Sequence, residues 1–130
     1  VMPFSLEKTL HIFNKTKTGG VQQVIVKDTS DKAQIELIQQ HLSALAQGFK
    51  HGDFSGPQAI HGKAMAGLDS LSKNAADIDF NYQALINGAQ INYSTTKPEL
   101  ISVIHQYFDA QLSDHARHAI SNEHALHHNY

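Results

Sequence analysis

The side chains best suited to chemistry in this sequence are its histidines. There are ten in 130 residues, and half of them lie in the last sixteen positions. Histidine titrates near neutral pH and is the commonest protein ligand for transition metals. The chain has no cysteine, which excludes disulfides, thiol catalysis and cysteine-based zinc or iron–sulfur sites. Any transition-metal site must therefore use histidine, methionine, aspartate or glutamate.

The most suggestive pair is His115 and His118, in the stretch FDAQLSDHARHAI. The stretch begins as an amphipathic helix, and residues three apart share one helical face. We therefore expect the two imidazoles to point in a similar direction. The alternative is that His115 donates to a carbonyl oxygen and packs by its ring face, while His118 is solvated at the helix end, where positive charge is mildly favourable. A metal site needs at least one further ligand.

Two other places could supply that ligand. In AIHGKAMAG, His61 and Met65 are four residues apart, and an imidazole with a thioether favours copper. The alternative is that Met65 fills a gap beneath a sheet. The third place is His11, a strand residue on the same face as Phe13, which is either buried or at a site on the sheet surface. The predicted ligands of a copper or zinc site are thus two pairs and this strand residue: His115, His118, His61, Met65 and His11.

The other histidines are expected to carry no site. The three in the terminal segment 121–130 have almost no apolar anchor. His41, His51 and His105 fall outside the apolar stripes of the predicted helices, so we expect their imidazoles to be solvated.

Known catalytic motifs are missing from the sequence. It has no Gly-x-Ser-x-Gly elbow, no P-loop and no dinucleotide fingerprint, so no nucleotide or organic cofactor is implied. Ser113, Asp114 and His115 are consecutive, and consecutive helical residues point in different directions. We therefore expect a binding protein rather than an enzyme. The alternatives are a protein- or ligand-interaction module without metal and an acid–base enzyme centred on His115.

Composition excludes two further classes of function. The formal net charge is −2 and lysine and arginine form no cluster, so the chain lacks the electrostatic footprint of a nucleic-acid binder. No apolar run approaches the ~20 residues that a transmembrane helix needs. Hydrophobic residues make up 41% of the chain, which is enough for a core. One domain, residues 1–130, is expected at this length.

The same order of elements is predicted twice. Residues 9–15 and 21–27 alternate in polarity around Thr18-Gly19-Gly20, and residues 78–83 and 91–93 do so around Asn87-Gly88, as in hairpins. Each hairpin precedes an amphipathic helix. A shift of 66 residues aligns six identical pairs and sets His115 on Phe49, so we expect His115 to be partly buried. The pairs are Ile25/Ile91, Thr29/Thr95, Ile35/Ile101, Ile38/Ile104, Gln40/Gln106 and Ala44/Ala110.

The predicted fold is α+β and built from two β-β-α units. Each hairpin has one apolar face that needs a partner, so we expect one four-stranded antiparallel sheet covered by two long helices. The units span about residues 7–52 and 77–120. Residues 53–76 are too many for a bare loop, and we expect one or two short helices there, including one with Leu68, Leu71 and Ala75.

Four stretches also carry a resemblance: TGGVQQVIV, KHGDFSGPQAIHG, GAQINYSTT and FDAQLSDHARHA. Over residues 9–119 the chain resembles a family of small bacterial proteins, many exported, that are sometimes loosely labelled aspartate carbamoyltransferase. The chain has a single arginine, Arg117, whereas that activity needs clamps for a phosphate and a dicarboxylate. Carbamoyltransferase activity is therefore not expected.

The resemblance bears on the predicted site and on location. Relatives read Asp-Met-Pro-Gly where this chain has Ala64-Met65-Ala66-Gly67. His61 and Met65 match the family pattern, while the acidic residue is missing. The resemblance implies a periplasmic or secreted protein. The sequence leaves the protein partner and the oligomeric state open.

Overall fold

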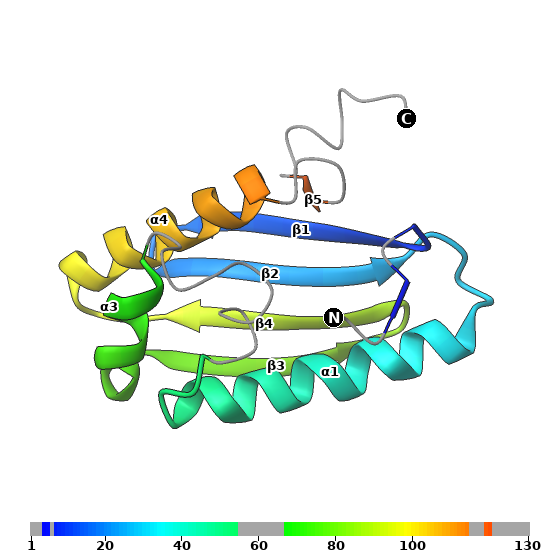
Figure 1. The fold of residues 1–130 in the computed structure, drawn as a ribbon, viewed down its shortest axis with the longest axis horizontal. Coiled ribbons are helices and arrows are strands. Elements are labelled where there is room, and N and C mark those ends of the chain that lie inside the picture. The colour runs from blue at the N-terminus through cyan, green and yellow to red at the C-terminus, as the bar shows by residue number, and fades with distance from the viewer. Residues whose placement is uncertain (1–3, 6, 55–66, 115–118, 121–130) are drawn as a thin grey trace.

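A computed structural model describes residues 4–5, 7–54, 67–114 and 119–120 (Figure 1). The elements follow the predicted order, with two hairpins that each precede a long helix. They are β1 (Thr9–Thr16), β2 (Gly19–Val26), α1 (Lys32–Lys50), α3 (Leu68–Lys73), the 3-10 helix η1 (Ala75–Asp77), β3 (Asp79–Leu85), β4 (Gly88–Ser94), α4 (Pro98–Asp114) and β5 (Ala119–Ile120).

The strands form one sheet in the order β3-β4-β2-β1-β5. The pairs β1–β2, β2–β4 and β3–β4 are antiparallel, which confirms the predicted four-stranded antiparallel sheet. The fifth strand, β5, pairs in parallel with β1 and was not predicted. Two residues are too short a stretch for an alternating pattern to show.

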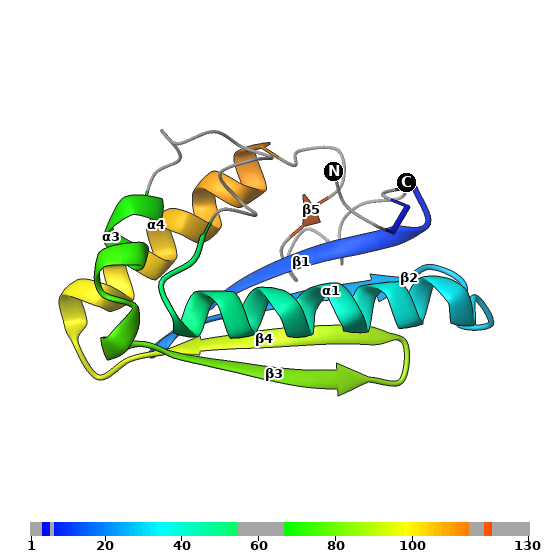
Figure 2. The same ribbon diagram turned by 60° about the horizontal axis from the view of Figure 1, so that its bottom comes forward.

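Both long helices lie on the same face of the sheet, and no described helix covers the other face (Figures 1 and 2). Helix α1 packs mainly on β3 and β4, whereas α4 packs on β1 and β2. Each helix therefore covers the hairpin of the other half. The apolar face of each hairpin is therefore buried by the helix of the other half of the chain.

The predicted shift of 66 residues matches the two long helices, but the two hairpins match at a different shift. Ile38 and Ile104 are both fully buried, as the shift of 66 predicts. Ile25 faces away from the helices, however, whereas Ile91 faces them and is fully buried, so the match of these two residues is wrong. The path from Gly19 to α1 is three residues longer than the path from Gly88 to α4, and the hairpins therefore match at a shift of 69.

Two polar contacts repeat under this corrected alignment. The Gln39 side chain donates from Nε2 to the Leu85 carbonyl oxygen at 3.1 Å, and His105 Nε2 lies 2.8 Å from the Thr16 carbonyl oxygen. Since a carbonyl oxygen only accepts, the Nε2 proton of His105 is the donor. Thr16 and Leu85 each end the first strand of a hairpin, so each helix is fastened to the opposite hairpin at an equivalent point. His105 is half-buried, and the prediction that it is solvated is wrong.

The core between sheet and helices is largely aromatic, with Tyr93 at its centre. The Tyr93 ring lies 5.0 Å from Phe108 and 5.4 Å from Phe80, centroid to centroid. Its hydroxyl donates to Gln22 Oε1 at 2.6 Å, and both side chains are buried. A polar group can be buried at little cost when it is hydrogen-bonded. Burial also raises the pKa of Tyr93 well above its usual value.

The connection between the halves is partly helical, as predicted. Leu68 and Leu71 lie in α3 and are fully buried, and Ala75 is buried in η1. The predicted short helix therefore exists but ends at Lys73. Residues 55–66, where a second short helix was predicted, lie outside the described residues.

Candidate functional site

Most of the predicted metal ligands fall outside the described part of the chain. Four of them lie there, namely His61, Met65, His115 and His118. The residue on which the acid–base alternative is centred, His115, therefore also lies outside the described residues. Within the described residues, no group of three or more His, Cys, Asp or Glu side chains could hold a metal ion. His11 is the predicted ligand whose surroundings the structure describes.

His11 lies on the helix-covered face of β1 and is 2% exposed. Phe13, two residues along the strand, shares this face and this burial. The His11 ring lies 5.5 Å from the Phe4 ring, with the planes tilted by 38°. Of the two expected environments, burial or a site on the sheet surface, the structure therefore selects burial. An imidazole packed in this way has few orientations left to it.

A second imidazole flanks the same phenyl ring. His41, on α1, lies 5.5 Å from Phe4 in an edge-on arrangement and is half-buried. The prediction that it is solvated is wrong, whereas His51 at the end of α1 is exposed as predicted. The sequence did contain a signal for the partial burial of His41. The 66-residue shift pairs His41 with Tyr107, and Tyr107 is 1% exposed.

Burial lowers the pKa of His41, because taking the imidazole out of water disfavours its charged form. In the unfolded chain its pKa returns to about 6.5. Below that pH the unfolded state binds the proton more readily than the folded state does. The contribution of His41 to the free energy of unfolding should therefore be constant above about pH 7. It should fall as the pH drops through the pKa that His41 has in the unfolded chain.

The replacement His41→Gln should flatten this pH dependence. Urea unfolding measured at pH 7.5 and pH 5.5 checks it, since the loss of stability between the two should be smaller in His41→Gln than in the unaltered chain. His51→Gln is the matched control, because His51 is exposed and its removal should leave the slope unchanged. Equal slopes for the unaltered chain and His41→Gln would show that His41 is solvated after all.

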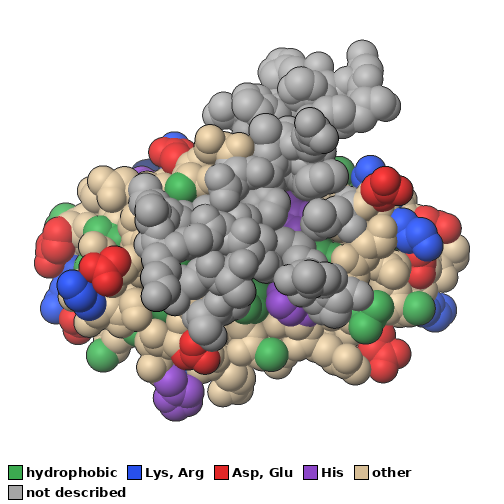
Figure 3. Space-filling model, viewed as in Figure 1, with side chains coloured by type: hydrophobic (Ala, Val, Ile, Leu, Met, Phe, Trp, Pro, Cys, Tyr) green, Lys and Arg blue, Asp and Glu red, His purple; other side chains and the backbone are tan. Residues whose placement is uncertain are grey.

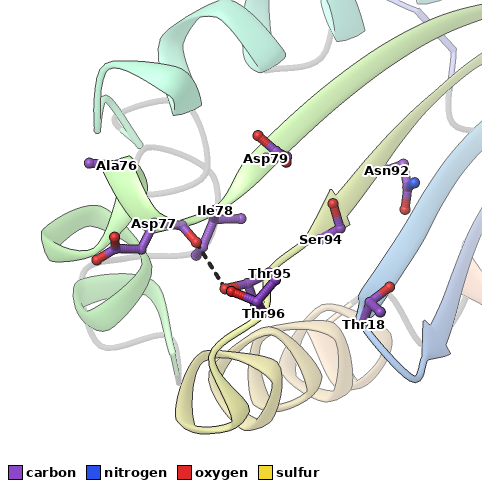
Figure 4. Close-up of a pocket in the computed structure, with 9 residues that line it drawn as sticks. All are labelled: Thr18, Ala76, Asp77, Ile78, Asp79, Asn92, Ser94, Thr95 and Thr96. Atoms are coloured by element: carbon purple, nitrogen blue, oxygen red, sulfur yellow. Dashed lines mark hydrogen bonds between the residues drawn. The ribbon is translucent and has the colours of Figure 1, made fainter.

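A polar hollow lies at the other end of the sheet (Figure 4). Its volume is about 540 Å³. The Thr95 hydroxyl donates to the Asp77 carbonyl oxygen at 2.8 Å, and the Asp77 carboxylate pairs with Lys97 Nζ at 3.1 Å. An adjoining hollow of about 390 Å³ shares part of the lining. The larger one is lined by Thr18, Ala76, Asp77, Ile78, Asp79, Asn92, Ser94, Thr95 and Thr96.

The chemistry of this hollow is that of hydrogen bonding. Hydroxyl, amide and carboxylate groups line it, and its lining contains neither a histidine nor a lysine. A nucleophile with an adjacent histidine base is therefore lacking there. The hollow faces away from the helices at Ser94, whereas His11 faces toward them, so the two places are separate. Sequence reasoning missed the hollow because its residues come from four separate segments.

Comparisons with protein-family models, with curated proteins and with solved structures yield no match. Among the described residues, no helix is both long enough and apolar enough to cross a membrane.

Proposed function

We propose that this chain is a small binding protein that takes up a copper or zinc ion through histidines. His11 and the pair His115 and His118 are the proposed ligands. One observation carries the proposal: β5 runs beside β1 so that Ala119 is the partner of His11 in the pairing. The pair that the sequence singled out thus immediately precedes a residue seated next to the buried strand histidine.

Chain connectivity sets a limit on the distance involved. Paired strands lie about 4.8 Å apart, and consecutive Cα atoms about 3.8 Å. The Cα of Ala119 is therefore about 5 Å from that of His11. His118 is bonded to Ala119, and an imidazole nitrogen extends several ångströms from its Cα, so we propose that both imidazoles bind one ion.

The surroundings of His11 suit a ligand in a second way. Its ring packs against Phe4 inside the protein, and fixing a side chain before binding reduces the entropy lost when the ion arrives. His61 and Met65 remain proposed additional ligands. Their imidazole and thioether would shift the preference toward copper.

Calorimetric titration with Zn²⁺ and with Cu²⁺ tests the proposal. A chain ending at Ile120 removes the three tail histidines and keeps every described element. We expect this chain to bind with a Kd of about 1 µM or tighter. Because loss of even an outer partner costs metal affinity about 10–100-fold, His11→Ala and His118→Ala should each weaken binding by at least ~10-fold.

His51→Ala is the matched control, since His51 is exposed at the end of α1 and its loss should not change affinity. Circular dichroism checks that each variant is folded, and His11→Asn replaces His11→Ala if the cavity proves too costly. Binding that disappears with the tail, or that is unchanged in His11→Ala and His118→Ala, rules out the proposed site.

We also propose that the protein works outside the cytoplasm, as a periplasmic or secreted protein. This part rests on the resemblance to exported bacterial proteins alone, and cell fractionation with an antibody tests it. The alternative of an interaction module has a separate basis, which is the uncovered edge of the sheet.

A further inference from the structure

The strand β3 forms an open edge of the sheet. It is the last strand in the order, and in the described part of the chain no strand lies beyond it, whereas β1 at the other side is paired with β5. Asn81 and Gln83 are exposed on the face without helices. Ala84 points to the helix side and is exposed as well, so α1 leaves this part of the edge uncovered.

Within the described residues, this edge lacks the usual protection against strand pairing. Exposed edges are commonly guarded by lysine, proline, a bulge or an inward-pointing charge. The sequence of β3 is DFNYQAL, in which Asp79 at the start is the sole charged residue. Figure 3 shows charged side chains at both ends of the face viewed in Figure 1. Next to the edge, Ile86 in the hairpin turn is 96% exposed.

We propose that β3 pairs antiparallel with β3 of a second copy of this chain, so that two sheets join into one. Centring the pairing on Tyr82 uses all seven residues of the strand. Asn81 of each copy then lies opposite Gln83 of the other, and Asp79 lies opposite Leu85. The two carboxylates are thereby kept apart at opposite ends of the interface.

A row of amides argues for a second copy as the partner. Gln23 Nε2 donates to Gln90 Oε1 at 2.9 Å, and Gln90 Nε2 donates to Gln83 Oε1 at 3.3 Å. The row runs from β2 across β4 to β3 and ends at the open edge, where the Gln83 side-chain amide can donate further. An amide both donates and accepts, so Asn81 of a second copy can accept from Gln83 and continue the row. Because a two-fold axis relates the two copies, this contact forms twice.

The helix side of the edge fits the same partner. Tyr82 is half-buried and would meet its own counterpart across the axis, while Phe80 would face the small Ala84. Aromatic pairs are favourable directly across strands. One strand pair buries less area than most stable interfaces, so we expect a reversible dimer with a Kd between about 1 µM and about 1 mM.

Sedimentation of the full chain, run in EDTA to separate this question from metal binding, tests the proposal. From about 10 µM to about 1 mM the mass should rise from one chain toward two. The double variant Asn81→Lys/Gln83→Lys sets two lysines directly opposite each other at two places, with Cβ atoms about 5 Å apart, and should stay monomeric. Its control, Ser102→Lys/Gln106→Lys, adds the same charge to exposed positions on α4, which packs on β1 and β2, and should still dimerise.

A mixing experiment with oppositely charged variants tests the pairing most directly. Mixing Asn81→Lys/Gln83→Lys with Asn81→Glu/Gln83→Glu should restore a dimer that contains one copy of each. If the lysine variant fails to fold, Ala84→Lys serves instead, because it opposes a charge to Phe80 of the other copy. The proposal is overturned if the unaltered chain remains a monomer throughout, or if its dimer persists unchanged in the lysine variants.

Discussion

Replacing Gly88 by alanine is expected to destabilise the fold strongly. A Cβ built at Gly88 would collide with the carbonyl oxygen of Val24 and lie 2.9 Å from the Cα of Ile25. Both atoms belong to the backbone of β2, which cannot move aside as a flexible side chain can. Because β2 and β4 join the two halves at the centre of the sheet, we expect a loss of about 3 kcal/mol or more in the free energy of unfolding.

Thermal and urea unfolding followed by circular dichroism measure this loss. Gly19→Ala should behave alike, since Gly19 is the equivalent residue of the first hairpin and its Cβ would collide with the carbonyl oxygen of Tyr93. Ser102→Ala is the control, because Ser102 is exposed on α4 and the change should stay within ~0.5 kcal/mol. Near-normal stability of Gly88→Ala would mean that β2 and β4 do not approach each other as described.

Replacing Phe108 by alanine should remove about 3–5 kcal/mol of stability, the usual cost of deleting a buried aromatic ring. The Phe108 side chain is fully buried. Its ring centroid lies 5.5 Å from that of Phe13 and 5.0 Å from that of Tyr93. Those two residues come from different hairpins, so the deletion opens a cavity where both halves meet. Small domains have a total stability of only about 5–15 kcal/mol.

Equilibrium urea unfolding gives the size of this effect. Phe108→Leu should cost less than Phe108→Ala, because leucine leaves a smaller cavity. Gln106→Ala, at an exposed position of the same helix, controls for changes in helix propensity. A cost below about 1 kcal/mol for Phe108→Ala would contradict the burial of this ring.

Local patterns in the sequence were enough to predict the two hairpins and the two long helices. Alternating polarity and turn residues predicted both hairpins, and apolar residues three and four apart predicted the helices that became α1 and α4. They also indicated the sheet and the duplication. These features depend on neighbours within a few residues, and the sequence displays such neighbours directly.

The offset between the two halves shows where local patterns stop being sufficient. Identical residues favoured a single shift of 66, yet Ile25 and Ile91 lie on opposite faces. Successive strand residues alternate between faces, so an odd error in alignment reverses every side chain. Gly19 and Gly88 lie against equivalent carbonyl oxygens, those of Tyr93 and Val24, so the hairpins match at a shift of 69 and three extra residues precede α1.

By itself, the sequence determined the β-β-α order, the apolar faces and the histidine positions on which the proposed metal site depends. The tertiary structure alone decided that each helix covers the other half's hairpin, that His41 and His105 are half-buried, and that β5 seats Ala119 beside His11. It also decided that β3 is left as an open edge. The physical reason is that burial and strand pairing depend on residues far apart in the chain, whose encounter no local spacing records.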